Sequence, residues 1–463
     1  MAWKHRDSAA KPAENSITEG VIWRNLLTFF FPILLGTFFQ QLYNTADAII
    51  VGKFVGKEAL AAVGGATGNL INLVVGFFVG LSSGATVILS QFFGGRRDQE
   101  VSHTVHTAAA FALAGGLALT VLGVAFSPAI LGMMGTPPDV MAHAVTYIRI
   151  YFLGMIPSLI YNIGSAVLRA VGDSRRPLFF LMSACMVNIL LDIVLVLGLE
   201  LGVAGAALAT ILSQTVSAAL VIITLMRTSL SYRLEPRKIR FYGYLLNRIV
   251  RIGLPAGLQS VMYSLSNVII QASVNGFGTD VLAAWTAYGK MDGLFWMMVN
   301  AFGISITTFV GQNFGARQYD RVRKSVRVCL GMTALATLVM SSIMLLLGGP
   351  LYRLFTDDAQ VVEQGLAILR LLVPTYVTYI CIEVLSGAVR GAGDSLIPTL
   401  FTLGGVCLLR VVWVLGIAPA YHSLRVVLLS YPITWTVTSV LFIVYYLKGG
   451  WLKRCIRKAQ PAG

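Results

Sequence analysis

Charged side chains are scarce in this sequence. Asp, Glu, Lys and Arg make up only 12% of the 463 residues, whereas apolar residues make up 56%. Because water-soluble domains carry about 25% charged residues, the composition excludes a soluble enzyme. Lys and Arg nevertheless outnumber Asp and Glu by 35 to 20, which leaves a net charge of +15. These charges must occupy the few polar gaps between apolar stretches, so their positions are informative.

Cysteine and histidine are also few, with five of each. The cysteines show neither a metal-type spacing nor a disulfide framework. The histidines fall in tails, loops or helix ends, and His103 with His106 lacks a third metal ligand. We therefore expect no catalytic constellation, no enzyme activity and no cofactor. Residues 1–20 lack an apolar core followed by a cleavage site, so we expect no signal peptide.

Apolar runs of about 20 residues, the length of a membrane-spanning helix, are abundant. They predict an all-α polytopic membrane protein. Twelve such segments are expected, at 22–50, 59–90, 104–126, 140–163, 178–199, 203–226, 245–275, 281–310, 326–348, 362–388, 397–418 and 424–447.

The gaps between these segments divide the basic residues unequally. If successive gaps alternate sides, 27 Lys and Arg fall on one side of the membrane. The opposite side receives only Lys53, Lys57, Arg353 and Arg425. The positive-inside rule then places both termini in the cytoplasm. We expect the protein to lie in the cell inner membrane. Anionic lipid headgroups account for the central basic run, so we expect membrane lipids and no nucleic acid as partners.

Two motifs recur at one spacing. SQFFGGRRDQEV at 90–101 matches GQNFGARQYDRV at 311–322, and LRAVGDSRRP at 168–177 matches VRGAGDSLIP at 389–398, each 221 positions later. The repeat predicts two homologous six-helix halves in the same orientation, with substrate bound between them and access alternated by rocking. The R-x-x-G-D turns within it are either structural or gating contacts.

The repeat also predicts the domain organisation. We expect a cytoplasmic tail at 1–20, an amino-terminal lobe of six helices at 21–226 and a cytoplasmic linker at 227–244. A carboxyl-terminal lobe of six helices at 245–447 and a basic cytoplasmic tail at 448–463 complete the chain.

Four of the 20 acidic residues fall inside membrane segments, where ionisable groups are costly and usually functional. They are Asp47, Asp192, Asp292 and Glu383. The first segment places Asp47 on one helix face with three other polar residues, at i, i+3, i+4 and i+7. These three are Gln40, Tyr43 and Asn44. Such a stripe is not expected to face lipid.

Further polar residues fall at a similar membrane depth to Asp47. Asn188 and Asp192 lie one helical turn apart, and Thr210 follows a short turn at a comparable depth. These oxygen-bearing side chains with Asp47 suit a hard monovalent cation or a shared proton. Separate helix–helix hydrogen bonds are the alternative. Pro32 predicts a kink in the first helix.

The second half lacks this acidic set, because the repeat pairs Asp47 with Ile270 and Asp192 with Trp413. It carries a different set of Lys290, Asp292 and Glu383. Two interpretations stay open for that set: structural pairing, or part of a substrate cavity.

Taken together, these motifs resemble the multidrug and toxic compound extrusion (MATE) family over nearly the whole chain. The matching pieces are P-x14-D with NTADAIIVG, QFFGGRR, RAVGDSRRP, NILLD-x17-T, GQNFGARQ and RGAGDSLIP. The resemblance implies twelve helices in two lobes and an antiporter that exchanges cationic, aromatic drugs for H+ or Na+. It implies a cation site at Asp47, Asn188, Asp192 and Thr210, and a bending proline at Pro32.

The resemblance also implies a cavity for small-molecule substrates. Its polar positions are similar to Gln40, Tyr43 and Asn162 here, and we add Asn44, Tyr263, Asp292 and Glu383. Tyr263 stands where one branch of the family has a glutamate, which argues against a second ion site. We expect a monomer. The alternative function is a lipid-linked saccharide flippase of the same superfamily, which requires a strongly cationic cavity.

Overall fold

Long α-helices form nearly all of residues 17–459, the part of the chain that the computed structural model describes. Residues 1–16 and 460–463, and with them Lys4, Arg6 and Lys11 and most of the expected amino-terminal tail, lie outside this range. The described range contains helices and turns but no strand. The prediction of an all-α membrane protein is therefore confirmed.

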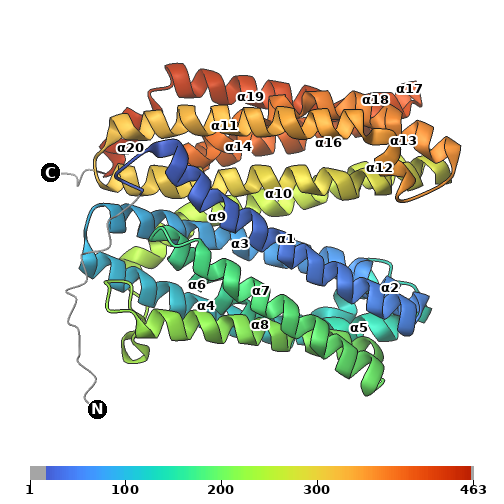
Figure 1. Ribbon diagram of the computed structural model, residues 1–463, viewed down its shortest axis with the longest axis horizontal. Helices are drawn as coiled ribbons and strands as arrows, with labels where there is room; N and C mark the ends of the chain where they lie inside the picture. The colour runs from blue at the N-terminus through green and yellow to red at the C-terminus, as the bar shows by residue number, and fades with distance from the viewer. Residues whose placement is uncertain (1–16, 460–463) are drawn as a thin grey trace, which may run out of the picture.

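The first half of the chain forms a bundle in the lower part of Figure 1. Its elements are α1 (Ile22–Phe54), α2 (Lys57–Gly64), α3 (Ala66–Gly94), α4 (Asp98–Met133), α5 (Pro138–Leu153), α6 (Met155–Ala170), α7 (Arg175–Asp192), the π-helix η1 (Ile193–Gly198) and α8 (Gly202–Arg227).

The second half forms the upper bundle, and a short 3₁₀ turn, η2 (Pro236–Lys238), lies between the halves in sequence. Its elements are α9 (Gly243–Asn275), α10 (Thr279–Gly315), α11 (Tyr319–Leu346), α12 (Gly348–Arg353), α13 (Ala359–Leu372), η3 (Val373–Thr375), α14 (Tyr376–Gly391), α15 (Leu396–Thr402), η4 (Leu403–Leu408), α16 (Leu409–Val412), η5 (Trp413–Ile417), α17 (Ala418–Tyr421), α18 (Leu424–Leu428), α19 (Ser430–Lys448) and α20 (Trp451–Ala459).

Ten helical segments in the described range are long and apolar enough to cross a membrane. The pair α5 and α6, which bends by 51°, makes an eleventh span. The one remaining expected segment, 245–275, forms the 33-residue α9, which is long enough but too polar to qualify by composition. The polarity has a structural cause, because Gln259, Ser260 and Asn267 of α9 line an internal cavity.

The internal repeat is visible in the backbone. Helices α6 and α14 begin and end 221 positions apart. Arg96 and Arg317, also 221 apart, both adopt positive φ, at 54° and 59°. Gly172 and Gly393 do the same at 95° and 99°, a region that side chains disfavour. Equivalent turns therefore connect equivalent helices in the two halves.

The halves meet along several helix pairs, and two of these seams differ in kind. In the first, the backbones of α3 and α9 touch, because Gly84 faces the Ile249 carbonyl and Gly253 faces the Leu81 carbonyl with no room for a Cβ atom. Gly80 and Gly257 extend the contact by one turn on each helix. Small residues four positions apart allow such close approach of membrane helices.

In the second seam, α1 packs on α10 through aromatic rings. Phe30 stacks on Phe302 with ring centroids 4.1 Å apart, and Phe29 meets Phe309 edge-on at 6.1 Å. Beyond Pro32, α1 leaves α10 and packs on α7, where Gly36 faces Leu181. Figure 1 shows α1 crossing obliquely from one bundle to the other.

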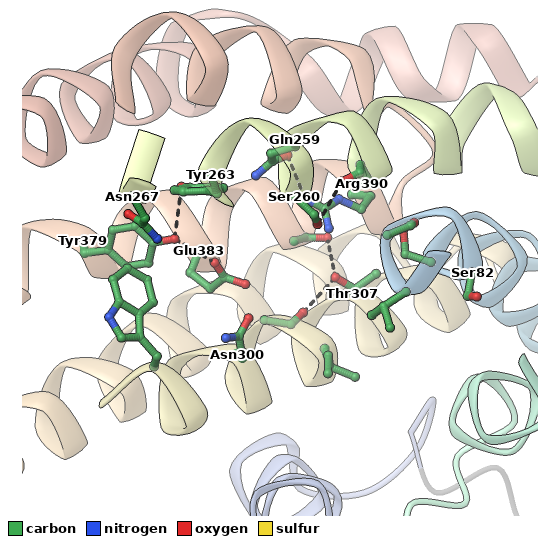
Figure 2. A pocket seen from close by; sticks show the side chains of 18 of the residues that line it. Ser82, Gln259, Ser260, Tyr263, Asn267, Asn300, Thr307, Tyr379, Glu383 and Arg390 are labelled. Atoms are coloured by element: carbon green, nitrogen blue, oxygen red, sulfur yellow. Dashed lines mark hydrogen bonds between the residues drawn. The ribbon is translucent and has the colours of Figure 1, made fainter. Parts of the chain in front are cut away.

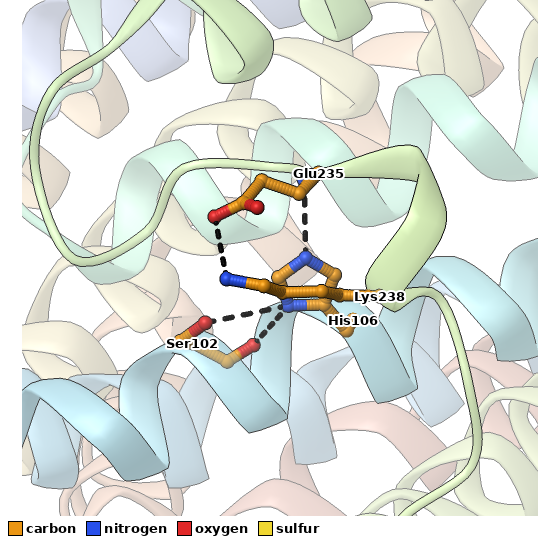
Figure 3. Close-up of polar contacts among 4 residues, drawn as sticks. All are labelled: Ser102, His106, Glu235 and Lys238. Carbon is orange, nitrogen blue, oxygen red and sulfur yellow. Dashed lines mark hydrogen bonds and ion pairs between the residues drawn. The ribbon is translucent and has the colours of Figure 1, made fainter.

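The segment between the halves, 228–242, is bound to α4. The Glu235 backbone N–H donates to Nε2 of His106 at 3.0 Å, and Nδ1 of His106 lies 2.7 Å from the Ser102 carbonyl. Figure 3 shows this contact beside the Glu235–Lys238 ion pair of 2.9 Å. The His106 ring therefore joins α4 to the segment between the halves.

The described chain ends and the turns at 95–97, 171–174, 228–242, 316–318 and 392–395 all lie at one end of the bundle, on the left in Figure 1. We call it the terminal end. Helix α20 packs there with Trp451, Leu452 and Cys455 buried. Its Lys458 reaches the buried carboxylate of Asp394 at 2.9 Å, so most of the expected tail is an ordered helix.

Candidate functional site

Helices α1, α7 and α8 bring four polar side chains together inside the first half. The Asp47 carboxylate accepts hydrogen bonds from Thr210 Oγ1 at 3.0 Å and from Asn188 Nδ2 at 3.4 Å. Asp192 lies beside Asp47. All four are at most 4% exposed. The convergence expected from the depths of these residues in the sequence is therefore present.

The Asp192 carboxylate lacks hydrogen-bond donors. Neither of its oxygens has a partner among the described residues, and the amide oxygen of Asn188 is also without one. Two buried carboxylates in contact repel each other unless a proton or a cation lies between them. The cluster therefore presents oxygen atoms to a small positive species.

The backbone of α7 changes its winding just after this site. The α-helix ends at Asp192 and continues as the π-helix η1 over Ile193–Gly198. A π-helical turn also occurs in the second half, where η5 begins at Trp413, the repeat mate of Asp192. Such turns occur often at functional sites. Only the first half, however, carries the carboxylate at this position.

The other polar residues of the α1 stripe lie beside this cluster and do not line the main cavity. Tyr43 is buried next to Gln40, and Tyr147 and Tyr151 of α5 lie close to it. Gln40 is exposed, and so is Asn44, which donates to Gln41. The placement of Gln40, Tyr43 and Asn44 thus differs from the sequence expectation, because α1 diverges from α10 after Pro32.

A cavity of about 570 Å³ lies between the halves. Its lining comes from α3 and α6 of the first half and mainly from α9, α10 and α14 of the second (Figure 2). Of the predicted cavity residues, it contains Asn162, Tyr263, Asp292 and Glu383. These four predictions of position agree with the structure.

Asp292 is held at the wall of this cavity by neutral donors. Tyr376 donates its hydroxyl at 2.5 Å, Trp296 Nε1 donates at 2.7 Å and Tyr288 donates at 3.2 Å. Lys290 is exposed, and none of the ion pairs within residues 17–459 joins it to Asp292. Structural pairing with Lys290 is therefore wrong, because residues two apart on a helix point to different faces.

Glu383 belongs to a second polar chain on the same wall. The Tyr379 hydroxyl donates to Glu383 at 3.3 Å and lies 3.3 Å from the Tyr263 hydroxyl (Figure 2). Trp296 packs edge-on against Tyr379 with centroids 4.7 Å apart. An aromatic wall with two carboxylates therefore faces the cavity.

Sequence reasoning missed three cavity arginines, Arg169, Arg390 and Arg410. Arg169 and Arg390 belong to the R-x-x-G-D motifs. The motif predicts a turn at a helix end and does not indicate a cavity. It also missed the aromatic partners of Asp292, although Tyr288 and Trp296 stand one helical turn on either side of it. That i, i+4 spacing was the available signal.

Two reciprocal hydrogen bonds close the terminal end of this cavity. Gln91 of α3 donates to the Gly391 carbonyl of the second half at 2.9 Å. Its repeat mate Gln312 of α10 donates to the Ala170 carbonyl of the first half at 2.6 Å. Ala170 and Gly391 are themselves 221 positions apart, so the two contacts are pseudo-symmetric. We call this pair the glutamine latch.

Residues 17–20, which precede α1, strengthen this closure. Arg321 donates to the carbonyls of Ile17, Glu19 and Gly20, and Asn313 also donates to Ile17. The Ile17 side chain is buried. The gating interpretation of the R-x-x-G-D turns gains support, because the latch carbonyls stand directly after Arg169 and Arg390.

Known proteins match both halves of this chain. The MatE family profile matches residues 32–194 and again 255–415. The probable multidrug resistance protein YoeA of Bacillus subtilis is 27% identical over 447 residues, covering 94% of this chain and 96% of YoeA. The multidrug export protein MepA of Staphylococcus aureus is 23% identical, covering 89% of this chain and 94% of MepA.

Solved structures show the same fold. The crystal structure of MATE in the straight conformation superposes with a TM-score of 0.87 at 21% identity, covering 95% of this chain and 99% of that one. An outward-facing multidrug resistance MATE family transporter of the MOP superfamily gives 0.87 at 21% identity, covering 96% and 98%. The structural match extends over nearly the whole chain.

Proposed function

Because the chain belongs to the MatE family, we propose that it is a secondary active antiporter that exports cationic or amphipathic drugs in exchange for H+ or Na+. Its relatives YoeA and MepA, named for multidrug resistance and multidrug export, support drug efflux. The proposal requires a coupling-ion site, a substrate cavity and a means of alternating access.

The observation that carries the proposal is the contact between Asp47 and Asp192. Asp192 is fully buried without a hydrogen-bond donor, so an uncompensated charge there is costly. A proton or Na+ bound between the carboxylates relieves that cost. Asn188 and Thr210 complete the oxygen-rich surroundings. Binding and release of the ion therefore change the electrostatic energy of α1, which carries Asp47.

Helix α1 connects this site to both halves. It packs on α10 before Pro32 and on α7 after it, and proline weakens the helix by removing a backbone hydrogen bond. We propose that Pro32 is the hinge at which α1 bends when the ion occupies its site. Rocking of the two halves then opens the glutamine latch and alternates access to the cavity.

Orientation in the membrane follows from charge. We propose that the protein lies in the inner membrane with its terminal end on the cytoplasmic side, because the basic segments between the helices lie at that end. We propose two lobes, 21–226 and 245–447, which the cytoplasmic linker 227–244 joins. We also propose that the transporter is a monomer. A latch closed at the cytoplasmic end corresponds to an outward-facing state.

The lining charge of the cavity discriminates against the flippase alternative. The lining contains three arginines and two carboxylates, Asp292 and Glu383. A cavity for a lipid-linked pyrophosphate requires a strong positive excess without an aromatic wall bearing acids. The mixed lining favours drug-like amphipathic substrates.

Replacing Asp47 tests the coupling site. We expect Asp47→Asn to reduce drug efflux from cells to the level of the empty vector, because the pair then lacks one of its two charges. Asp280→Asn, an exposed residue in the first turn of α10, is the matched control and should retain full efflux. Full resistance in cells that contain folded, membrane-inserted Asp47→Asn protein would falsify the mechanism.

Gradients imposed on proteoliposomes identify the ion. Drug efflux is measured with a pH gradient alone and with a sodium gradient alone. Transport that stops only when the pH gradient is collapsed assigns H+ and excludes obligatory Na+ coupling. If neither the pH gradient nor the sodium gradient drives drug transport, the antiport proposal is contradicted.

A further inference from the structure

Another cavity, separate from the central one, lies inside the first half. It has a volume of about 220 Å³, lies between α4, α6 and α8, and is covered by the segment 228–242 between the halves. All of its lining residues are apolar, including Leu234, Pro236 and Ile239 of that segment. An apolar cavity of roughly 150 Å³ holds a benzene molecule, so this one has room for a length of hydrocarbon chain.

The segment that covers the cavity is fixed on two sides. The Leu234 backbone N–H donates to the Leu225 carbonyl of α8 at 2.9 Å, and the Glu235 N–H donates to His106 of α4 at 3.0 Å (Figure 3). The Leu234 side chain is only 7% exposed. The space beneath this segment is therefore a feature of the folded protein.

The cavity opens toward the lipid-facing surface. Leu113 of α4 and Met226 of α8 both line it and are 41% and 38% exposed. One and two turns farther along α4, Leu117 and Val121 extend the same exposed apolar stripe. Such a stripe on a membrane protein contacts lipid tails, so a hydrocarbon chain is the group that reaches this opening.

The second half has larger side chains at equivalent positions. Helices α4 and α11 begin 221 positions apart, and α8 and α19 end 221 positions apart. The lining residues Ala109 and Val221 therefore correspond to Leu330 and Phe442, which pack in the core of the second half. Because empty space costs packing energy, the smaller residues of the first half indicate that a ligand completes the packing there.

Basic residues surround the cover of the cavity. The stretch 227–240 contains five Lys and Arg and one acidic residue, Glu235, which is already in an ion pair. Arg227 and Arg237 each directly follow a lining residue and are exposed. Neither forms an ion pair within residues 17–459. Their guanidinium groups can therefore bind an anionic headgroup at the edge of the cavity.

We propose that this cavity is a binding site for one anionic phospholipid, with an acyl chain under the segment 228–242 and the headgroup bound by Arg227 and Arg237. Arginine matches phosphate oxygens with two parallel hydrogen bonds. The bound lipid connects α4, α6 and α8 to the segment between the halves. This site is independent of the central cavity and of the proposed antiport.

Two lipids with the same acyl chains test the headgroup. Dioleoyl phosphatidylglycerol is anionic, and dioleoyl phosphatidylcholine has no net charge. Each lipid is titrated into the purified full-length protein in detergent, and binding of the first lipid molecule is measured by native mass spectrometry. For the wild-type protein we expect phosphatidylglycerol to bind at least about 5-fold more tightly, the effect of one basic residue near an anionic headgroup.

Charge variants locate the headgroup. Arg227→Gln and Arg237→Gln should each weaken phosphatidylglycerol binding about 5-fold and change phosphatidylcholine binding less than about 2-fold. Lys448→Gln is the matched control, because Lys448 is exposed and stands 221 positions after Arg227, at the end of α19. This control should leave both affinities unchanged.

A filled cavity tests the acyl chain. Ala109→Leu introduces the side chain that the second half carries at the equivalent position. It should weaken both lipids by a similar factor of about 5 or more, because the new side chain competes with the acyl chain that they share. Val121→Leu, on the exposed face of α4, is the control and should change neither affinity. Thermal unfolding confirms that both variants are folded.

Three outcomes overturn the proposal. Equal binding of the two lipids by the wild-type protein, which needs no variant to fold, contradicts an anionic headgroup site. An equal loss in Lys448→Gln and Arg227→Gln indicates attraction to any basic surface. Unchanged lipid binding by folded Ala109→Leu protein shows that the headgroup binds without the cavity.

Discussion

Two of the seams between the halves are built from opposite kinds of residue. The α3–α9 seam is a contact of backbones at Gly84 and Gly253, whereas the α1–α10 seam is a contact of rings at Phe30 and Phe302. Two backbones in direct contact lose much of their van der Waals packing when the helices move apart even slightly. Apolar side chains can shift and repack at small cost, because the burial that holds them together is non-directional. The glycine seam therefore suits a fixed axis and the phenylalanine seam suits a moving one.

The site lies on the moving side. Asp47 belongs to α1, the helix of the phenylalanine seam, whereas Gly84 and Gly253 hold helices that carry no buried carboxylate. An ion bound at Asp47 therefore acts on the element that is less tightly held. The comparison suggests that the halves rock about α3 and α9 while α1 bends.

Adding a methyl group to the glycine seam is the strongest way to break this comparison. We expect Gly84→Ala to lower stability by about 3 kcal/mol or more, because the new Cβ meets the Ile249 carbonyl, which cannot move aside. Thermal unfolding in detergent measures the loss. Gly76→Ala on the same helix, whose Cβ meets only Ser260 at 3.6 Å, should be close to neutral.

Thermal unfolding of a variant in the α1–α10 seam tests the other half of the comparison. Phe30→Leu should cost only about 1 kcal/mol, since the α1–α10 contact can repack. Equal losses for Gly84→Ala and Phe30→Leu are incompatible with one fixed and one moving seam.

The hinge of α1 is tested by Pro32→Ala. Alanine restores the backbone hydrogen bond that proline lacks, so the helix becomes stiffer. We expect transport in proteoliposomes to fall about 10-fold, as for substitutions that restrict a rate-limiting motion, while the melting temperature stays the same or rises. Unchanged transport places the bend elsewhere in α1.

The glutamine latch gives the smallest expected effect. Gln91→Ala and Gln312→Ala each remove one hydrogen bond between the halves, worth about 1 kcal/mol. Each change should make a cysteine placed at Ala166, on the cavity wall of α6, more reactive to a polar thiol reagent added at the terminal end. Gln318→Ala, outside the latch, should not. If the cysteine stays unreactive in the double variant, the contacts of residues 17–20 are enough to close this end.

Much of the carboxylate site was predictable from sequence. Asp47, Asn188, Asp192 and Thr210 sit at depths that helix geometry predicts to coincide, and a polar residue in an apolar helix must find a partner. The 221-residue repeat likewise predicted paired helices such as α6 and α14. These inferences depend on local spacing, which the chain itself encodes.

The central cavity was harder to predict because it joins distant segments. Asn162, Tyr263, Asp292 and Glu383 were expected there and lie there, but Gln40, Tyr43 and Asn44 do not. The helical period gives a common face without saying which neighbour that face meets. Arg169 and Arg390 were assigned to turns because their motif says nothing of a cavity above them.

The sequence by itself determined an all-helical membrane protein with a repeat of 221 residues and a small set of buried acids, because hydropathy and spacing act along the chain. Tertiary structure alone decided which partners those acids have. Asp292 is satisfied by Tyr376 and Trp296, whereas Asp192 has no donor among the described residues. Both are carboxylates in apolar helices, and only the packing of neighbouring helices separates a satisfied one from one that needs an ion.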